Sequence, residues 1–279
     1  MKHVVAICAL ACVLAAVADP VKAGPGGGGA SMPDVDKVEL EGEYPGHLQD
    51  VCRDNAGFLY WAHTHYILKT DARGKVLLKA AVDGHNAGCE VKDGVLYVAV
   101  CPLQNKTGGQ TTPECRLQIN EYDTETLALH EKHVLPVNDR AGSLAILEDG
   151  SFVVGCLRPK DILPSQARFH HVGSDFSLKS THLLDNVNVR LGIEVIKRRG
   201  DTLFMMLCGS PTVKVDAKTF AETGRLEYRG GQTGLFFDGD YCWRGYIRQP
   251  EGLKVWKSWI KRCRVEDFMR DGGQPSGRR

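Results

Sequence analysis

A unit of short alternating segments recurs five times along the chain, at intervals of about 40 to 56 residues. Each copy has an apolar segment, a tight turn and a second β-rich segment, and the copies begin at Gly46, Asn86, Gly142, Leu191 and Thr233. Repeats of this length are typical of propeller blades and of helical solenoids. The chain must therefore fold as a ring or stack of similar units.

The alternation within each copy decides between these two architectures. Residues 67–71, 118–123 and 213–216 alternate apolar and polar side chains and end in a turn-forming Asp, and residues 253–256 keep the alternation without the Asp. Apolar residues of a helical repeat would instead recur every three or four positions. The sequence predicts an all-β fold, a five-bladed β-propeller of four-stranded antiparallel blades. Residues 253–256 are expected to form the third strand of the fifth blade.

A ring of blades must also be closed. A strongly alternating segment, residues 36–44, precedes the first copy, and the fifth copy ends near residues 262–266. We expect this N-terminal strand to join the last blade at its outer edge and so tie the two ends together. The alternative is a free edge strand before the first blade.

The remaining segments indicate export. Residues 1–23 read as a signal peptide, with a basic start, an apolar core and small-x-small cleavage sites. Residues 24–35 are expected to form a flexible linker, 36–268 a single propeller and 269–279 a disordered tail. A secreted or periplasmic protein follows. A net charge of +1 favours neither nucleic acid nor membrane as partner, and we expect a monomer without integral membrane contact.

Eight of the ten cysteines follow the predicted leader, and disulfides are plausible in an exported chain. Cys101 and Cys115 flank a polar loop between neighbouring strands and make the first candidate pair. Cys156 and Cys208, at equivalent positions of adjacent blades, make the second. The other four are expected to be buried free thiols, namely Cys52, Cys89, Cys242 and Cys263.

Meander geometry allows candidate site residues to be placed. Loops that lead into inner strands and loops that leave second strands lie on the same face of a propeller, whereas the opposite face holds mostly Asp-Gly and Arg-Gly turns. The first face is expected to carry the chemistry, and it collects Trp61, His47, His63, His65, His85, Asn86, Arg140, Arg158, Arg190 and Arg244.

Two kinds of site suit these residues. Histidines such as His47 and His85 could bind a divalent metal with Asp50, Glu90 or Glu194 as third ligand, or could simply be solvated. The arginines, opposite Trp61, could clamp an anionic sugar or an organic acid, or could pair with loop acids. A divalent metal is thus the one cofactor for which the sequence offers ligands.

The chain resembles exported bacterial five-bladed propellers and, more loosely, NHL-repeat, streptogramin-lyase and gluconolactonase-like proteins. The resemblance rests on residues 46–49, 59–61, 68–76, 84–86 and 96–100. It implies a propeller fold and export. Such proteins carry a His-Leu-Gln-Gly segment and a His-His pair, where this chain has Asp50 and Asn86 at the differing positions.

The sequence therefore predicts a secreted propeller that binds a small anionic or carbohydrate ligand at its axial mouth. If the protein is an enzyme, we expect a hydrolase or lyase that acts on this ligand, with His47 and His85 as the catalytic candidates. The ligand-binding candidates are Trp61, His63, Asn86, Arg140, Arg158, Arg190 and Arg244. The alternative is a non-catalytic module that binds protein or glycan through the same loops.

Overall fold

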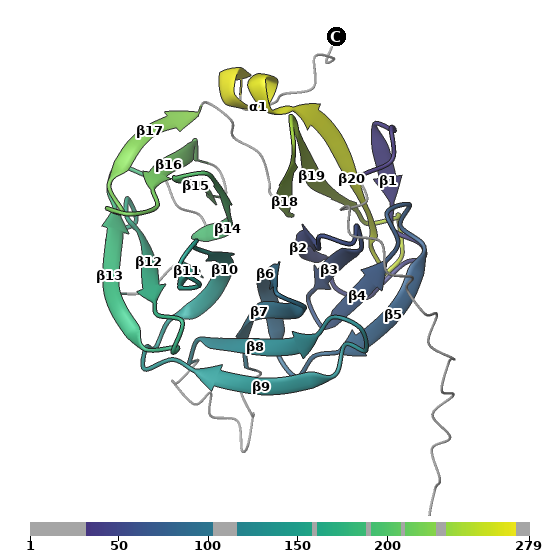
Figure 1. Ribbon diagram of the computed structural model, residues 1–279, viewed down its shortest axis with the longest axis horizontal. Coiled ribbons are helices and arrows are strands. Elements are labelled where there is room, and N and C mark those ends of the chain that lie inside the picture. The colour runs from purple at the N-terminus through teal and green to yellow at the C-terminus, as the bar shows by residue number, and fades with distance from the viewer. Residues whose placement is uncertain are drawn as a thin grey trace, which may run out of the picture.

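Five four-stranded antiparallel sheets stand around one axis, as the computed structural model shows (Figure 1). The structure describes residues 32–102, 116–157, 161–187, 191–207, 210–226 and 233–271. The predicted five-bladed β-propeller is confirmed. The predicted signal peptide, most of the predicted linker and most of the predicted tail lie outside the described residues.

The first four blades are simple meanders whose strands run outward from the axis in chain order. Their strands are β2 (Leu48–Arg53), β3 (Leu59–His63), β4 (Tyr66–Thr70) and β5 (Val76–Ala81); β6 (His85–Lys92), β7 (Val95–Cys101), β8 (Gln118–Asp123) and β9 (Leu129–Val134); β10 (Arg140–Ile146), β11 (Phe152–Leu157), β12 (Ala167–Val172) and β13 (Leu178–Leu184); and β14 (Ile193–Arg199), β15 (Thr202–Leu207), β16 (Thr212–Asp216) and β17 (Glu222–Leu226).

The fifth blade joins the two ends of the chain. It contains β18 (Leu235–Asp238), β19 (Tyr241–Arg248), β20 (Lys257–Arg264) and, at its outer edge, β1 (Lys37–Glu39). Val38 of β1 lies opposite Ile260 of β20, and both side chains are buried. The predicted closure is therefore confirmed, and the helix α1 (Val265–Asp271) follows directly after β20.

One strand of the fifth blade was predicted wrongly. Residues 253–256 lie between β19 and β20, and the third strand of the blade is β20. The reason is the length of β19, whose eight residues carry the hairpin turn further along the chain. Trp256, the last residue of the alternating segment, instead makes an isolated bridge with Tyr44.

The core lies between the blades. Each of the five clusters of buried apolar side chains combines residues of two neighbouring blades, so that every blade packs on both faces. Complete burial of one such side chain contributes about 1.5 to 3 kcal/mol. The ring is thus held by five equivalent interfaces. Among the described residues, no helix is long and apolar enough to cross a membrane.

The inner strands β2 and β14 share an irregularity that matters for the site. Their pairing with the second strand shifts by one residue, between Leu48 and Asp50 in β2 and between Ile193 and Val195 in β14. A β-bulge leaves the extra residue unpaired and changes the direction of its side chain. The extra residues are Gln49 and Glu194, at equivalent positions near the start of the two strands.

Candidate ligand site at the axial mouth

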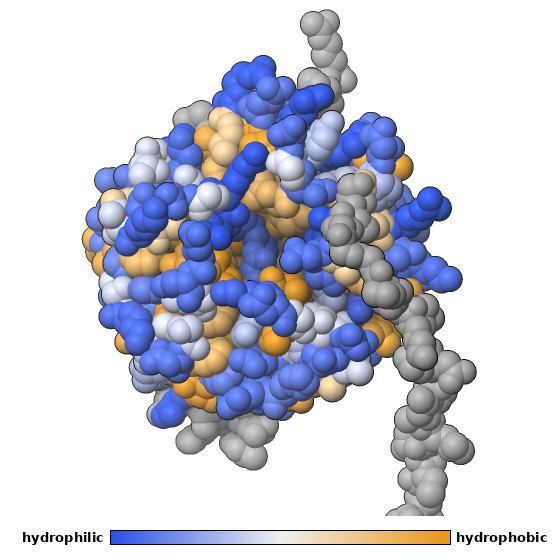
Figure 2. Space-filling view, viewed as in Figure 1, coloured by the Kyte–Doolittle hydropathy of each residue, from blue (hydrophilic) through white to orange (hydrophobic). Residues whose placement is uncertain are grey.

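The candidate site lies where the chain enters the inner strands. His47 directly precedes β2, His85 is the first residue of β6 and Arg140 is the first residue of β10. The three residues thus come from three consecutive blades and the same end of the axis. The face of the ring drawn in Figure 2 is hollowed near this axis. We call the set His47, Gln49, His85, Arg140 and Glu194 the axial mouth.

The side chain of Gln49 connects two histidines of the mouth. Its amide Nε2 lies 2.8 Å from Nε2 of His47 and 3.4 Å from Nε2 of His85. The two imidazole rings are 6.5 Å apart at their centroids, and the His47 ring also packs at 5.7 Å against Trp256. Three polar nitrogen-bearing groups therefore converge from two blades, in a half-buried setting.

Both imidazoles are neutral at pH 7. Burial lowers the pKa of His47, and it is also the main reason why the pKa of His85 is lowered. A charge on His47 would lower the pKa of His85 further, and the positive charge of Arg140 also lowers it. A neutral imidazole can accept a proton or bind a metal, whereas a charged one can do neither.

Glu194 is the bulged residue of β14 at the position equivalent to Gln49 of β2, which places an acid at the same end of the axis. Burial raises the pKa of its carboxyl to about 7, so that near neutral pH the group is divided between its two protonation states. Carboxylic acids with such pKa values serve as general acids or bases in many active sites.

The pKa of Glu194 leads to a pH-dependent prediction for Glu194→Gln. Because the pKa is raised on folding, the wild-type side chain contributes stability at low pH that is lost as the pH rises from about 4.5 to about 7. The neutral amide avoids this loss. We expect the variant to match the wild type near pH 4 and to be about 1 to 2 kcal/mol more stable at pH 8, a value that allows for partial exposure. Urea unfolding at the two pH values measures it, and an equal difference at both would refute the raised pKa.

Several predicted ligand-binding residues do not face the mouth. Trp61 is completely buried between the fifth and first blades, where its indole N–H donates to Thr70. His63 is buried beside the carbonyl of Gly46, and burial lowers its pKa to about 4. Both side chains point into the core between two blades and so do not face the mouth, which loop position alone does not reveal.

Asn86 and Arg244 are buried as well. The Asn86 amide donates to the carbonyls of His63 and Tyr66, and so joins the second blade to the first. Arg244 is 4% exposed, with its guanidinium 5.6 Å from the ring of Tyr246. Neither side chain is therefore presented to a ligand at the mouth. Arg158 and Arg190 lie outside the described residues, so their roles remain predictions.

The proposed third metal ligands Asp50 and Glu90 are committed elsewhere. Lys197 of β14 reaches across the axis, with its Nζ 2.9 Å from Asp50 Oδ2 and 2.9 Å from Glu90 Oε1. The same ammonium donates to the carbonyl of Cys89 at 2.8 Å. These ion pairs join the fourth blade to the first and second, and they leave neither carboxylate available to a metal at the mouth.

The opposite end of the axis has a cavity of about 200 Å³, a feature that was not predicted. Its charged lining residues include Arg53, Glu90 and Lys197. Arg53 pairs with Asp238 at 3.1 Å, and Lys197 pairs with Glu90 and Asp50, so these charges are already compensated within the protein. The axial mouth is therefore the better candidate site.

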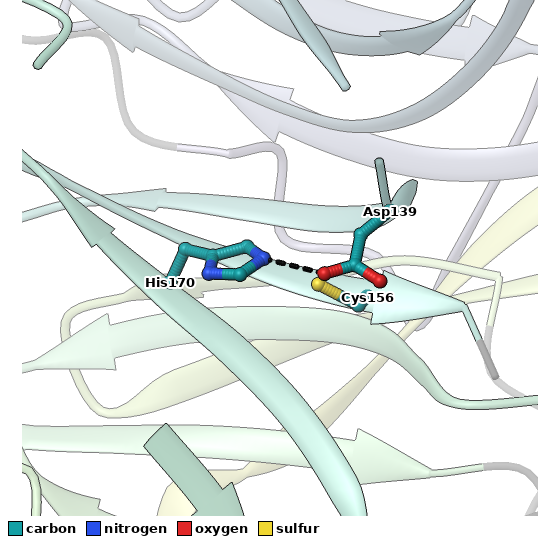
Figure 3. Close-up of side chains that lie close together, drawn as sticks. All are labelled: Asp139, Cys156 and His170. Atoms are coloured by element: carbon teal, nitrogen blue, oxygen red, sulfur yellow. Dashed lines mark hydrogen bonds and ion pairs between the residues drawn. The ribbon is translucent and has the colours of Figure 1, made fainter. Parts of the chain in front are cut away.

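A group of potential metal ligands lies in the third blade (Figure 3). Ligand atoms of Asp139, Cys156 and His170 all lie within 4.8 Å of one another, the one such group of three among the described residues. However, Arg168 Nη1 lies 3.1 Å from both carboxylate oxygens of Asp139, and His170 Nε2 lies 2.8 Å from one of them. The carboxylate is thus already bound by a permanent cation.

The protonation states of Asp139 and Cys156 also argue against a metal site in this group. Burial alone would raise the pKa of Asp139, but the hydrogen bonds of His170 and Arg168 outweigh it and lower the pKa. Burial, followed by the neighbouring Asp139, raises the pKa of the Cys156 thiol. Zinc binds the thiolate form of cysteine. The group therefore fits a buried ionic network better than a cation site.

Fold and mouth together define the class of the protein: a closed five-bladed β-propeller with a polar axial mouth. No family model matches the sequence, and no curated protein matches it either. Solved structures do match. One is a protein of unknown function from Bacteroides caccae, with 12% identity, a TM-score of 0.49 and coverage of 73% of this chain and 71% of that one.

Two further matches have names. The gluconolactonase from Xanthomonas campestris has 14% identity and a TM-score of 0.48, over 75% of this chain and 70% of that one. BamB from Moraxella catarrhalis has 13% identity and a TM-score of 0.40, over 75% of this chain and 57% of that one. All three TM-scores are below 0.5, and these similarities carry no information on activity.

Proposed function

We propose that the protein is an exported propeller that binds a small anionic ligand, such as a sugar acid or organic acid, at the axial mouth. The observation that carries this proposal is the convergence of His47, Gln49 and His85, with the charge of Arg140 acting on His85. The mouth thereby combines neutral hydrogen-bonding groups with a cationic one, which is the combination that a hydroxylated acid requires.

The roles of the residues follow from their chemistry. The Arg140 guanidinium, which is exposed, would pair with the acidic group of the ligand. The side chains of His47, Gln49 and His85 would hydrogen-bond to its hydroxyl or carbonyl oxygens. For a hydrolase or lyase, His47 or His85 would be the base that removes a proton from water or from a carbon next to the carboxylate, and Glu194 would be the acid. A divalent metal could bind the same neutral imidazoles.

Binding can be tested by thermal shift on residues 32 to 271. The panel contains divalent metals, uronic acids, other organic acids, sugar phosphates and neutral sugars, each with metal-stripped protein. A ligand at about one hundred times its dissociation constant adds about 2.7 kcal/mol, which raises the melting temperature by roughly 5 to 10 °C. We expect acids to give the shift and neutral sugars not to.

Variants connect the shift to the mouth. Arg140→Ala and His85→Ala should each remove most of the shift, since each deletes a group that contacts the ligand. His130→Ala, an exposed histidine on the outer strand β9, is the matched control and should keep it. A panel in which no acid stabilises the protein, or in which the control loses as much as His85→Ala, would contradict the proposal and favour a module that binds macromolecules.

A further inference from the structure

Two cysteines face each other in the blade that closes the ring. Cys242 of β19 and Cys263 of β20 are directly opposite in the antiparallel pairing, and their Sγ atoms are 3.0 Å apart. Directly opposite residues of such a pair have Cα atoms about 4.5 to 5.5 Å apart, which lies within the range of disulfide-bonded cysteines. No backbone movement is therefore needed to join them.

We propose that Cys242 and Cys263 form a disulfide that locks the closing blade of the propeller. This pair was expected to consist of free thiols, because the two residues are 21 positions apart and nothing local in the sequence connects them. The two pairs favoured from the sequence involve Cys115 and Cys208, which lie outside the described residues.

The surroundings make Cys263 the thiol that reacts first. It is partly exposed, whereas Cys242 is completely buried. The hydrogen bond with Cys242, supported by the charge of Arg244, lowers the pKa of Cys263, while the pKa of Cys242 is raised. The first proton of the pair thus leaves Cys263, and the thiolate is the form that attacks disulfides.

The reaction is a thiol–disulfide exchange with an external disulfide, such as oxidised glutathione or a disulfide-bonded oxidoreductase. The Cys263 thiolate attacks one sulfur of the oxidant and releases the other as a thiolate. Cys242 then loses its proton to solvent and attacks Cys263 Sγ, which releases the second sulfur. The two cysteines are oxidised by two electrons, and the external disulfide is reduced to two thiols.

The position of the bond gives it a mechanical role. Cys242 is the second residue of β19 and Cys263 the next-to-last of β20, so the bond joins the open end of this hairpin. The strand β20 also pairs with β1 and leads directly into α1, whose Phe268 packs against Phe204 of the fourth blade at 5.7 Å between ring centroids. The bond therefore fixes the strand that holds both ends of the chain.

Peptide mapping tests the bond directly. The protein is incubated with oxidised glutathione, its remaining thiols are alkylated under denaturing conditions, and the digest is analysed by mass spectrometry without reduction. We expect one peptide pair joined through Cys242 and Cys263. Recovery of both cysteines as alkylated peptides would overturn the proposal.

Stability gives a second readout. The bond should raise the melting temperature of the oxidised protein by roughly 5 to 10 °C relative to the reduced protein. Cys242→Ser and Cys263→Ser should each lose this part of the response to reductant, whereas Cys52→Ser, which removes another buried thiol, should keep it. An unchanged response in both serine variants at the pair would also overturn the proposal.

Discussion

Replacement of Lys197 by Met is expected to destabilise the protein by about 3 to 5 kcal/mol, measured by urea unfolding at pH 8. The substitution leaves Asp50, which is completely buried, and Glu90 without the ammonium that lies 2.9 Å from each of them. Uncompensated buried carboxylates are costly because burial disfavours their charged form.

The pH dependence of this variant gives a second criterion. Burial raises the pKa of Asp50 and of Glu90, and Lys197 opposes that rise. Without the lysine, the pKa of each carboxyl rises further. The variant is then most stable where both carboxyls are protonated, and it loses stability as they ionise with increasing pH. The deficit should thus be smaller at pH 5 than at pH 8.

Lys218→Met is the matched control for Lys197→Met. Its ammonium also forms an ion pair, at 2.8 Å from Asp201, but the side chain is 70% exposed. Exposed ion pairs contribute little to stability, so the control should remain close to the wild type. A Lys197→Met protein as stable as this control would show that the charges do not meet across the axis.

Gly142→Ala is expected to cost about 3 kcal/mol or more, measured in the same way. A Cβ atom at this position of β10 would lie 2.1 Å from the carbonyl oxygen of Ile193 in β14, so the backbone of one blade would have to move away from the next. Gly142 is the extra residue where the pairing of β10 with β11 shifts, and this is the point at which β10 approaches β14 so closely.

Gly200→Ala separates this contact from the general effect of replacing a glycine. Gly200 lies in the turn after β14 with φ of +57°, and nothing lies within 4 Å of an added Cβ. The left-handed conformation alone costs about 1 kcal/mol for alanine. If Gly142→Ala lowered the stability no more than Gly200→Ala, that result would contradict the close approach of β10 and β14.

Much of the fold was predictable because its signals are local. Period-two alternation and glycine turns mark each blade, and the alternating segment at 36–44 marks the closing strand. The third strand of the fifth blade was misplaced because the loop before β20 happens to continue the alternation. Only the pairing of Lys257–Arg264 with β1 and β19 distinguishes the true strand from that loop.

The site was less predictable because its residues depend on contacts between blades. The nearness of His47 and His85 follows from equivalent positions in neighbouring repeats. Gln49 was missed because a bulge, invisible in the sequence, frees it from the strand pairing. Lys197 stands in a Lys-Arg-Arg-Gly run that looks solvated, and its partners Asp50 and Glu90 are more than a hundred residues away.

NMR of the imidazole rings can show whether an anionic ligand binds between the histidines of the axial mouth. The protein is titrated with the acid from the panel that gives the largest thermal shift, and the ring signals of all histidines are followed. We expect the signals of His47 and His85 to shift until the site is saturated, and those of His133 and His182, on the outer strands β9 and β13, to stay unchanged. Saturable binding of the acid that leaves the His47 and His85 signals unchanged would contradict binding at the axial mouth.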